Sequence, residues 1–592
     1  MSRRDRPRAD ERGFVLVWFA VVIILLLAVA ALAVDILVGY SFAQRVQNAA
    51  DAGALAGVQH LPDDPTAARD TAREVVQRNV AVPGSAVTFA ARPVPTQLEV
   101  QVRAPVRTFF GKVLGVDSLT ITRRAVAEFD PPVLMGSPFS TFGNTPGTGE
   151  GNQPWYWAVV GGPLSVKGAG DAALSNWCDE PAPDGAFPWV GGYNQPVDNC
   201  PVGGTNPDHE AAQYFVVEKR GWGPLSVDLY DPAFIDTFGG GPLPACGHDA
   251  LRQVWEDSGR PPHLDPENAE YCSGDQYVRF QGWENPRYLD PASQGDFATA
   301  EALMDADGLA NDTTFTLYAP DWTPANPYDN ERNVPPVCTR TFQGHFNAQL
   351  ARLAAADGSF ATLHQWVQLC PAGGVSWPGR FVLRVSTASG THGLNRFAIR
   401  AYSGASAFGD PVVSVAAVER MAVYTNRSAS TGEFFLARVP PSSVDRTLTV
   451  TLFDTGDLIG AGPSGQTTLQ ILRQPGPALT PPGPPVPMQD CRYTPPPGPA
   501  AGPLAPWKPG ARPWGDFEPT SPGCTITGIT RAGYNGQYVT IEVPIPRIPT
   551  YDCDATKPDE CWLKLRFQAP AGVVDVSTWV ATLSGEPVRL VE

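Results

Sequence analysis

Residues 14–34 read FVLVWFAVVIILLLAVAALAV, a run of 21 residues without a charged or strongly polar side chain. As an α-helix, such a run measures about 30 Å, which is the thickness of the hydrocarbon core of a bilayer. Five arginines precede the run, at positions 3, 4, 6, 8 and 12, and Asp35 follows it. This charge asymmetry predicts a single transmembrane helix, with the basic tail 1–13 in the cytoplasm and the bulk of the chain outside.

The same segment has a second interpretation, as a cleaved signal peptide. Small residues stand at the spacing that a signal peptidase uses, in Ala28-Val29-Ala30 and again in Ala31-Leu32-Ala33. However, the apolar run is longer than the usual apolar region of a signal peptide, and a helical pattern continues without proline through Val58. The sequence therefore favours a membrane anchor over a cleaved signal.

The cysteines indicate the same orientation. All ten lie at or beyond position 178, which fits disulfides in an oxidising compartment, although ten free buried thiols are the alternative. No C-x-x-C pair is present and the histidines are scattered, so a zinc site is not expected. Pairing between neighbours is the default prediction: 178–200, 246–272, 338–370, 491–524 and 553–561.

Composition restricts the fold and the partners. A chain of 592 residues is too long for one ordinary domain, and its 58 glycines and 62 prolines predict turn-rich β structure with few long helices. The formal net charge of −17 argues against nucleic acid as a partner, because phosphate recognition needs an excess of lysine and arginine.

After the span, residues 45–58 read RVQNAADAGALAGV. On a helix, Asn48 and Asp51 share one face, and Ala50, Gly53, Ala54 and Gly57 form a stripe of small residues beside it. Small residues four positions apart let another helix approach closely. The stripe has two interpretations that spacing alone does not separate: it packs against the chain's own downstream domain, or it binds a partner helix.

The order of a basic tail, one span, Val34-Asp35 at its exit and then SFAQRVQNAADAGALAG (residues 41–57) resembles the N-terminal segment of the TadE/TadG-like proteins of the tight-adherence (Flp pilus) assembly system. The resemblance implies a membrane-anchored component of a pilus or adherence apparatus, with other TadE/TadG-like proteins as partners. The residues then expected to contact a partner helix are Asn48, Ala50, Asp51, Gly53, Ala54 and Gly57.

The chain departs from the family pattern at two places, and these indicate which kind of family member it resembles. Prepilin-like members have a glycine followed by a glutamate five residues into the apolar segment, whereas here Gly13 is followed by Trp18 at that place. Processing into a pilin is therefore not expected, and the longer, anchored TadG-like kind fits better. The Asp-x-Ser-x-Ser metal motif of larger members is missing, since Asp575-Val-Ser577-Thr-Trp579 lacks the last serine.

The predicted fold is a transmembrane helix that continues into a small-residue helix, a small α/β unit, and a mainly β ectodomain of β-sandwich or jelly-roll-like units. Pro65 to Asn79 is expected to be a helix of the α/β unit. Three alternating segments share an aromatic residue followed by an acidic turn, as related sandwich units would: 226–234, 315–324 and 448–457. The predicted segments are 14–34 (span), 35–60 (small-residue helix), 61–130 (α/β unit), 131–154 (linker), 155–340 (β-rich domain), 341–473 (β-sandwich), 474–523 (Pro-rich segment) and 524–592 (C-terminal strands).

Searches for catalytic motifs find neither G-x-S-x-G, nor H-E-x-x-H, nor a Walker loop, so no catalytic residue, no cofactor and no enzymatic activity is predicted. Asp454 and Asp457 are weak calcium candidates, with Asp231 and Asp321 at similar turns, but aspartates that simply form turns are the favoured interpretation. Tryptophans 155, 157 and 322 are expected in loops, where they would stack on sugars or fill a core.

These observations lead to three functional hypotheses. The first is a membrane-anchored, extracytoplasmic component of a bacterial Tad/Flp pilus assembly or adherence apparatus. The second is a membrane-anchored surface binding protein, such as an adhesin or a carbohydrate-binding protein. The third, an exported hydrolase, has the least support from the sequence.

Overall fold

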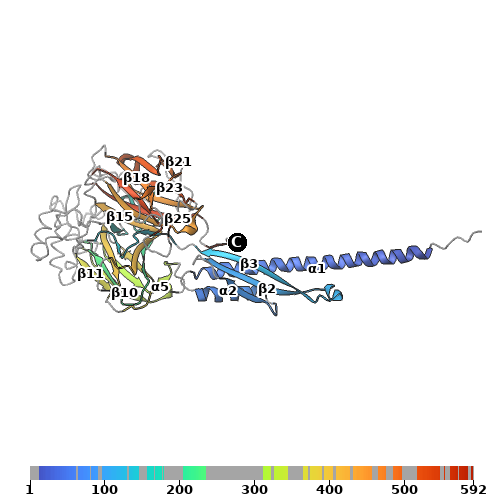
Figure 1. The fold of residues 1–592 in the computed structure, drawn as a ribbon. Helices are drawn as coiled ribbons and strands as arrows, with labels where there is room; N and C mark the ends of the chain where they lie inside the picture. The colour runs from blue at the N-terminus through green and yellow to red at the C-terminus, as the bar shows by residue number, and fades with distance from the viewer. Residues whose placement is uncertain are drawn as a thin grey trace, which may run out of the picture. The chain divides into compact units, whose positions relative to one another are not determined.

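Figure 1 shows the computed structural model of the chain, which divides into two compact units. Unit 1 comprises residues 1–131 and 586–592, and unit 2 comprises residues 132–585. The structure describes residues 12–61, 65–80, 82–90, 97–129, 132–145, 156–163, 165, 167–176, 178, 200, 205–234, 311–321, 326–344, 365–370, 374–389, 393–404, 409–426, 431–456, 465–474, 484–496, 517–546, 553, 560–570, 573–584 and 588–590.

Unit 1 packs two helices on an antiparallel sheet with the strand order β1-β2-β3-β26. Helix α2 starts at Pro65, a residue suited to the first turn, and buries Ala68, Ala72 and Val76 on one face, as the sequence predicts. The elements are α1 (Arg12–Val58), α2 (Pro65–Asn79), β1 (Ala86–Ala90), β2 (Gln97–Arg107), η1 (Gly111–Leu114), β3 (Ser118–Phe129) and β26 (Val588–Leu590).

Helix α1 has two halves of different character. The apolar side chains from Leu16 to Val34 are exposed, whereas Ala43, Val46 and Ala49 begin a face that is buried in unit 1. Figure 1 shows the N-terminal half extending beyond β2 and β3, with no other element of unit 1 beside it. With a mean hydropathy of 3.2 in its most apolar window, this helix is long and apolar enough to cross a membrane.

Unit 2 consists of two antiparallel sheets that face each other across one apolar core. The first sheet has the order β10-β9-β12-β7-β14-β4-β16-β24-β18-β19, with β22 also paired to β18. The second has the order β11-β8-β13-β6-β15-β25-β17-β23-β20-β21, with β5 paired to β13.

The strands of unit 2 follow one another along the chain with these bounds: β4 (Leu134–Gly136), β5 (Thr141–Phe142), β6 (Tyr156–Gly161), β7 (Gln213–Lys219), β8 (Ser226–Tyr230), β9 (Thr313–Tyr318), β10 (Pro336–Phe342), β11 (Trp366–Cys370), β12 (Gly379–Thr387), β13 (Leu394–Tyr402), β14 (Val413–Val418), β15 (Arg420–Asn426), β16 (Thr431–Arg438), β17 (Thr447–Phe453), β18 (Thr467–Arg473), β19 (Val486–Pro487), β20 (Arg492–Thr494), β21 (Glu518–Pro519), β22 (Thr525–Ile529), β23 (Tyr538–Pro544), β24 (Trp562–Gln568) and β25 (Val574–Leu583).

This strand order contains the jelly roll twice. Numbered along the chain, the eight strands from β6 to β13 form one sheet in the order 1-8-3-6 and the other in the order 2-7-4-5. The strands β15 to β18 followed by β22 to β25 repeat the same two orders. Both sets are therefore eight-stranded jelly rolls, joined edge to edge so that their sheets are continuous.

The observed division of the β region differs from the predicted one. The boundary predicted between 340 and 341 falls inside the first jelly roll, and the predicted linker 131–154 supplies β4, which pairs with both β14 and β16. The predicted C-terminal segment 524–592 is also divided, because β26 pairs with β3 of unit 1. Jelly-roll strands pair with partners far away in the sequence, so local composition does not mark these boundaries.

Four of the predicted disulfides are confirmed, namely Cys178–Cys200, Cys338–Cys370, Cys491–Cys524 and Cys553–Cys561. The fifth predicted pair, 246–272, lies outside the described residues. The second of these bonds connects β10 with β11 and thereby links the two sheets of the first jelly roll. The third joins Cys491, inside the predicted Pro-rich segment, to Cys524, directly before β22.

Candidate functional site

The part of α1 directly after its apolar run is held by a hydrogen-bonded clamp. Asp35, at the end of the apolar run, accepts backbone hydrogen bonds from Phe109 at 2.8 Å, Phe110 at 3.0 Å and Gly111 at 2.7 Å. These three N–H groups lie in the connection between β2 and β3, at the start of η1. The sequence did not single out Asp35 as more than an exit residue, because its partners are more than 70 positions away.

Farther along α1, the small residues contact the chain's own α2. Ala50 and Ala54 are fully buried. A Cβ atom at Gly53 would lie 2.5 Å from Val76 Cγ2, and one at Gly57 would lie 2.4 Å from the carbonyl oxygen of Ala68. The predicted stripe is therefore an internal packing surface, and its assignment to a partner helix is corrected, because α2 already occupies this close approach.

The two polar residues predicted to contact a partner lie beside that stripe. Asp51 is partly exposed and accepts a hydrogen bond from Gln47 Nε2 at 2.7 Å, while Asn48 is exposed. Gln47 also donates to the carbonyl oxygen of Arg124 at 3.0 Å, which ties α1 to β3. Of the six predicted contact residues, Asn48 alone has an exposed side chain, while Asp51 is partly covered.

The weak calcium candidates serve a repeated turn. Asp231 and Asp454 follow the third strand of each jelly roll, both with positive φ, and their N–H groups donate at 3.0 Å to the carbonyl oxygens of Gln365 and Gln537. Asp454 Oδ1 also accepts a bond from the N–H of Gly536 at 2.6 Å. The third of the predicted segments, 315–324, overlaps β9. This is the fourth strand of the first jelly roll, so it does not form this turn. Asp457 lies outside the described residues.

His60, His209 and Trp157, which were considered above for metal or sugar binding, make structural contacts instead. Among the described residues, no group of three or more His, Cys, Asp or Glu could hold a metal ion. His60 lies 3.1 Å from the Thr71 hydroxyl, and His209 lies 3.1 Å from the Ala173 carbonyl oxygen. Trp157 is fully buried and stacks on Tyr230, so it fills the core instead of binding a ligand.

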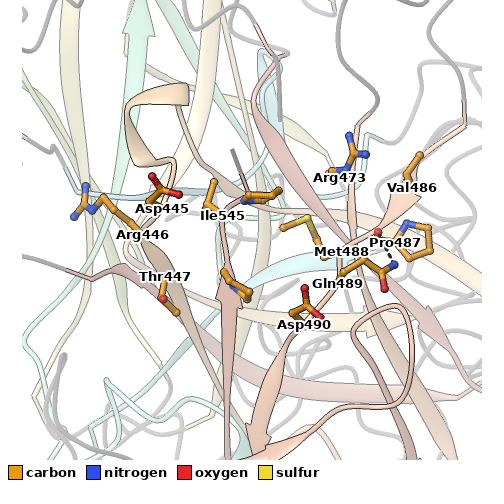
Figure 2. A pocket seen from close by; sticks show the side chains of 12 residues that line it. Asp445, Arg446, Thr447, Arg473, Val486, Pro487, Met488, Gln489, Asp490 and Ile545 are labelled. Carbon is orange, nitrogen blue, oxygen red and sulfur yellow. Dashed lines mark hydrogen bonds between the residues drawn. The ribbon is translucent and has the colours of Figure 1, made fainter. Parts of the chain in front are cut away.

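A cavity of about 550 Å³ opens at one end of the second jelly roll (Figure 2). Its wall brings together carboxylate, guanidinium and apolar groups, and Arg446 Nε is committed to the carbonyl oxygen of Ser584 at 2.7 Å. Histidine, cysteine and serine are missing from its lining, and Thr447 is the one lining residue with a hydroxyl group. The lining residues are Asp445, Arg446, Thr447, Arg473, Val486, Pro487, Met488, Gln489, Asp490, Pro544, Ile545 and Pro546.

An exposed aromatic site lies at the end of the first jelly roll. Trp222 is 78% exposed and Trp377 is 41% exposed, and the N–H of Gly223 donates to the carbonyl oxygen of Ser376 at 2.9 Å, which places the two tryptophans on adjoining segments. We call Trp222, Trp377 and Val412 the tryptophan site. The sequence did not predict this site, because the exposure of a loop tryptophan depends on which loops lie next to each other.

Lys219 holds the loops of the tryptophan site together. Its buried ammonium group donates to the carbonyl oxygens of Gly221 at 2.5 Å, Trp377 at 3.3 Å and Ser376 at 3.5 Å. Burial lowers the pKa of Lys219, while the nearby Asp410 carboxylate acts in the opposite direction. The aromatic side chains are thus presented by a fixed backbone.

Comparison of the chain with protein-family models, with curated proteins and with solved structures gives no match.

Proposed function

We propose that this protein is a single-pass membrane protein that displays a tandem jelly-roll ectodomain outside the cytoplasm, as a TadE/TadG-like component of a Tad/Flp pilus assembly or adherence apparatus. The observation that carries the anchor is the exposure of apolar side chains on all sides of α1 from Leu16 to Val34. A helix that is apolar all round needs an apolar surrounding, and the described residues of unit 1 provide none. Four disulfides in unit 2 support an oxidising compartment for the ectodomain.

The pilus-assembly part of this proposal rests on the resemblance of residues 41–57 and on their position directly after the span. Because the small-residue face is covered by α2, contacts with other TadE/TadG-like proteins would use the exposed surface of α1 before Ala43. Genes for a secretion ATPase and for other small TadE-like proteins beside this one would favour pilus assembly. An isolated gene would favour a surface binding protein.

Reporter fusions test the orientation. A reporter that is active only outside the cytoplasm is expected to be active when fused after Glu592 and inactive when fused to the N-terminus, because five arginines precede the span and a single acidic residue follows it closely. Replacing those five arginines by glutamine is expected to weaken this preference. An active N-terminal fusion would contradict the orientation, and a mature N-terminus near Asp35 in mass spectrometry would restore the signal-peptide interpretation.

A second candidate function, a surface carbohydrate-binding protein, is favoured by the tryptophan site. Two exposed indole rings on adjoining loops form a surface that stacks on sugar rings, and Lys219 keeps the loops in place without exposing its charge.

Substitutions at the tryptophan site test whether it binds carbohydrate. Trp222→Ala and Trp377→Ala are each expected to weaken glycan binding by about fivefold, because loss of an aromatic contact costs roughly 1 kcal/mol. Binding of the purified full-length protein to a glycan array would be compared with that of Val486→Ala, which changes an exposed apolar residue of the second jelly roll. Equal binding by all three variants would exclude the tryptophan site as the binding surface.

A further inference from the structure

The connection between β2 and β3 exposes a group of large apolar side chains. Val113 is 86% exposed and Phe109 is 68% exposed. We call this segment, residues 108–119, the hairpin tip; its exposed apolar residues are Phe109, Phe110, Val113, Val116 and Leu119. Among the described residues of unit 1, the other large exposed apolar side chains lie on α1 between Leu16 and Tyr40, apart from Leu590. The hairpin tip thus continues the apolar surface of the anchor helix.

The clamp at Asp35 sets the level of the hairpin tip along α1. The Asp35 carboxylate accepts three N–H bonds from the tip, and farther along the helix Gln47 bonds to Arg124 of β3, so the hairpin runs beside α1. On α1 the exposed apolar residues continue past Asp35 to Leu37 and Tyr40. Five residues of helix correspond to about 7.5 Å. The tip therefore lies beside a part of α1 whose outer surface is still apolar.

Charge on the hairpin complements a lipid surface. Between positions 103 and 124 the chain carries five basic residues and one acidic residue, Asp117, although the whole chain has a net charge of −17. Arg107 stands at the end of β2, and Arg103 lies about 13 Å farther from the tip. A basic collar behind an apolar tip is the pattern of segments that bind anionic headgroups while apolar side chains enter the acyl region. The five basic residues, all exposed, are Arg103, Arg107, Lys112, Arg123 and Arg124.

We propose that the hairpin tip inserts into the outer leaflet of the bilayer beside α1, with Phe109, Phe110 and Val113 among the acyl chains and the basic collar at anionic headgroups. This inference rests on the proposed membrane anchor. It also explains the clamp: lipid supplies no hydrogen-bond donors, so a carboxylate at this depth needs them from the protein. The hairpin provides three and leaves Asp35 only 8% exposed.

Depth-dependent fluorescence quenching tests the proposal on the full-length protein in nanodiscs that contain phosphatidylglycerol. A fluorescent amino acid would be introduced at Val113, at Leu25 in the middle of the span, or at Ala90, an exposed position of β1 in the same unit. Lipids with a nitroxide on the upper acyl chain would serve as quencher. The emission at position 113 is expected to fall about twofold, because interfacial segments reach roughly 5–10 Å below the headgroups, whereas position 90 should be unaffected.

The results at these three positions distinguish a failure of the proposed insertion from a failure of the proposed anchor. Quenching at 25 and 113 but not at 90 supports insertion of the hairpin tip. Quenching at 25 alone overturns the insertion and leaves the anchor intact; the exposed apolar group would then bind a protein partner. A lack of quenching at 25 overturns the anchor itself, and with it the basis of the inference.

Discussion

Replacing Gly57 by leucine is expected to displace α2 from α1 and to lower the stability of unit 1 by about 1–2 kcal/mol. At this position a Cβ atom alone would lie 2.4 Å from the carbonyl oxygen of Ala68, 2.7 Å from Leu98 Cδ2 and 2.8 Å from Ala72 Cβ. Overpacking of this kind costs about 1–3 kcal/mol or more, and a backbone oxygen cannot rotate away as a side chain can. The higher helix propensity of leucine offsets roughly 1 kcal/mol of that cost.

The rate of trypsin cleavage in α2 measures this displacement, because three arginines lie on the exposed face of the helix. Cleavage at Arg69, Arg73 and Arg78 requires that the helix unfold locally, so Gly57→Leu is expected to speed it up in the full-length protein. The matched control is Gly39→Leu on the same helix, where a Cβ atom meets nothing within 4 Å. Equal cleavage rates for both variants would show that the small-residue face does not pack on α2 in solution.

Local elements of unit 1 could be predicted well. The helix from Pro65 to Asn79 and the helical continuation through Val58 were both expected, because each is specified by nearby residues: a proline at the first turn, or small and apolar residues at helical spacing. The pairing of β26 with β3 was not predicted, because its partner is more than 450 positions away and a short strand carries no mark of its partner.

In unit 2 the sequence indicated a repeat but not its limits. Two of the three recurring strand ends, at Asp231 and Asp454, occupy equivalent third strands, and each bonds to a glutamine that precedes the sixth strand. The predicted β-sandwich, 341–473, nevertheless crosses from one jelly roll into the other. A continuous sheet lets strands of both domains follow each other without a linker.

The candidate sites were harder to predict than the fold. The Asp35 clamp and the Lys219 bonds join groups that are distant in the sequence, and each uses backbone atoms, which leave no trace in residue identity. The small-residue stripe shows the reverse difficulty. Its spacing correctly indicated a close helix contact, but spacing does not say whether the second helix belongs to the same chain.

A buried ion pair of the first jelly roll contacts two aromatic residues of the second. Lys167 lies in the segment between β6 and β7, its side chain is 0% exposed, and its Nζ is 2.5 Å from Asp208 Oδ2. The ammonium group also lies over two rings of the second jelly roll, 4.8 Å from the centre of Tyr538 and 5.2 Å from that of Phe453. The Tyr538 hydroxyl donates to the same carboxylate oxygen at 2.6 Å, so one cation and one anion join three segments.

Lys167→Met is expected to destabilise unit 2 by about 3–5 kcal/mol, because it leaves the Asp208 carboxylate buried without its cation. In the double variant Lys167→Met/Asp208→Asn both charges are gone, and the amide that replaces the carboxylate still offers an oxygen to the Tyr538 hydroxyl. Its loss of stability is therefore expected to be smaller than that of Lys167→Met alone, since neutral groups of similar volume often replace a buried ion pair at little cost. Chemical denaturation of the full-length variants, followed by near-ultraviolet circular dichroism, would give both values. A double variant at least as unstable as the sum of the two single variants would mean that the charges are not coupled, and that Lys167 stabilises the junction only through its contacts with the two rings.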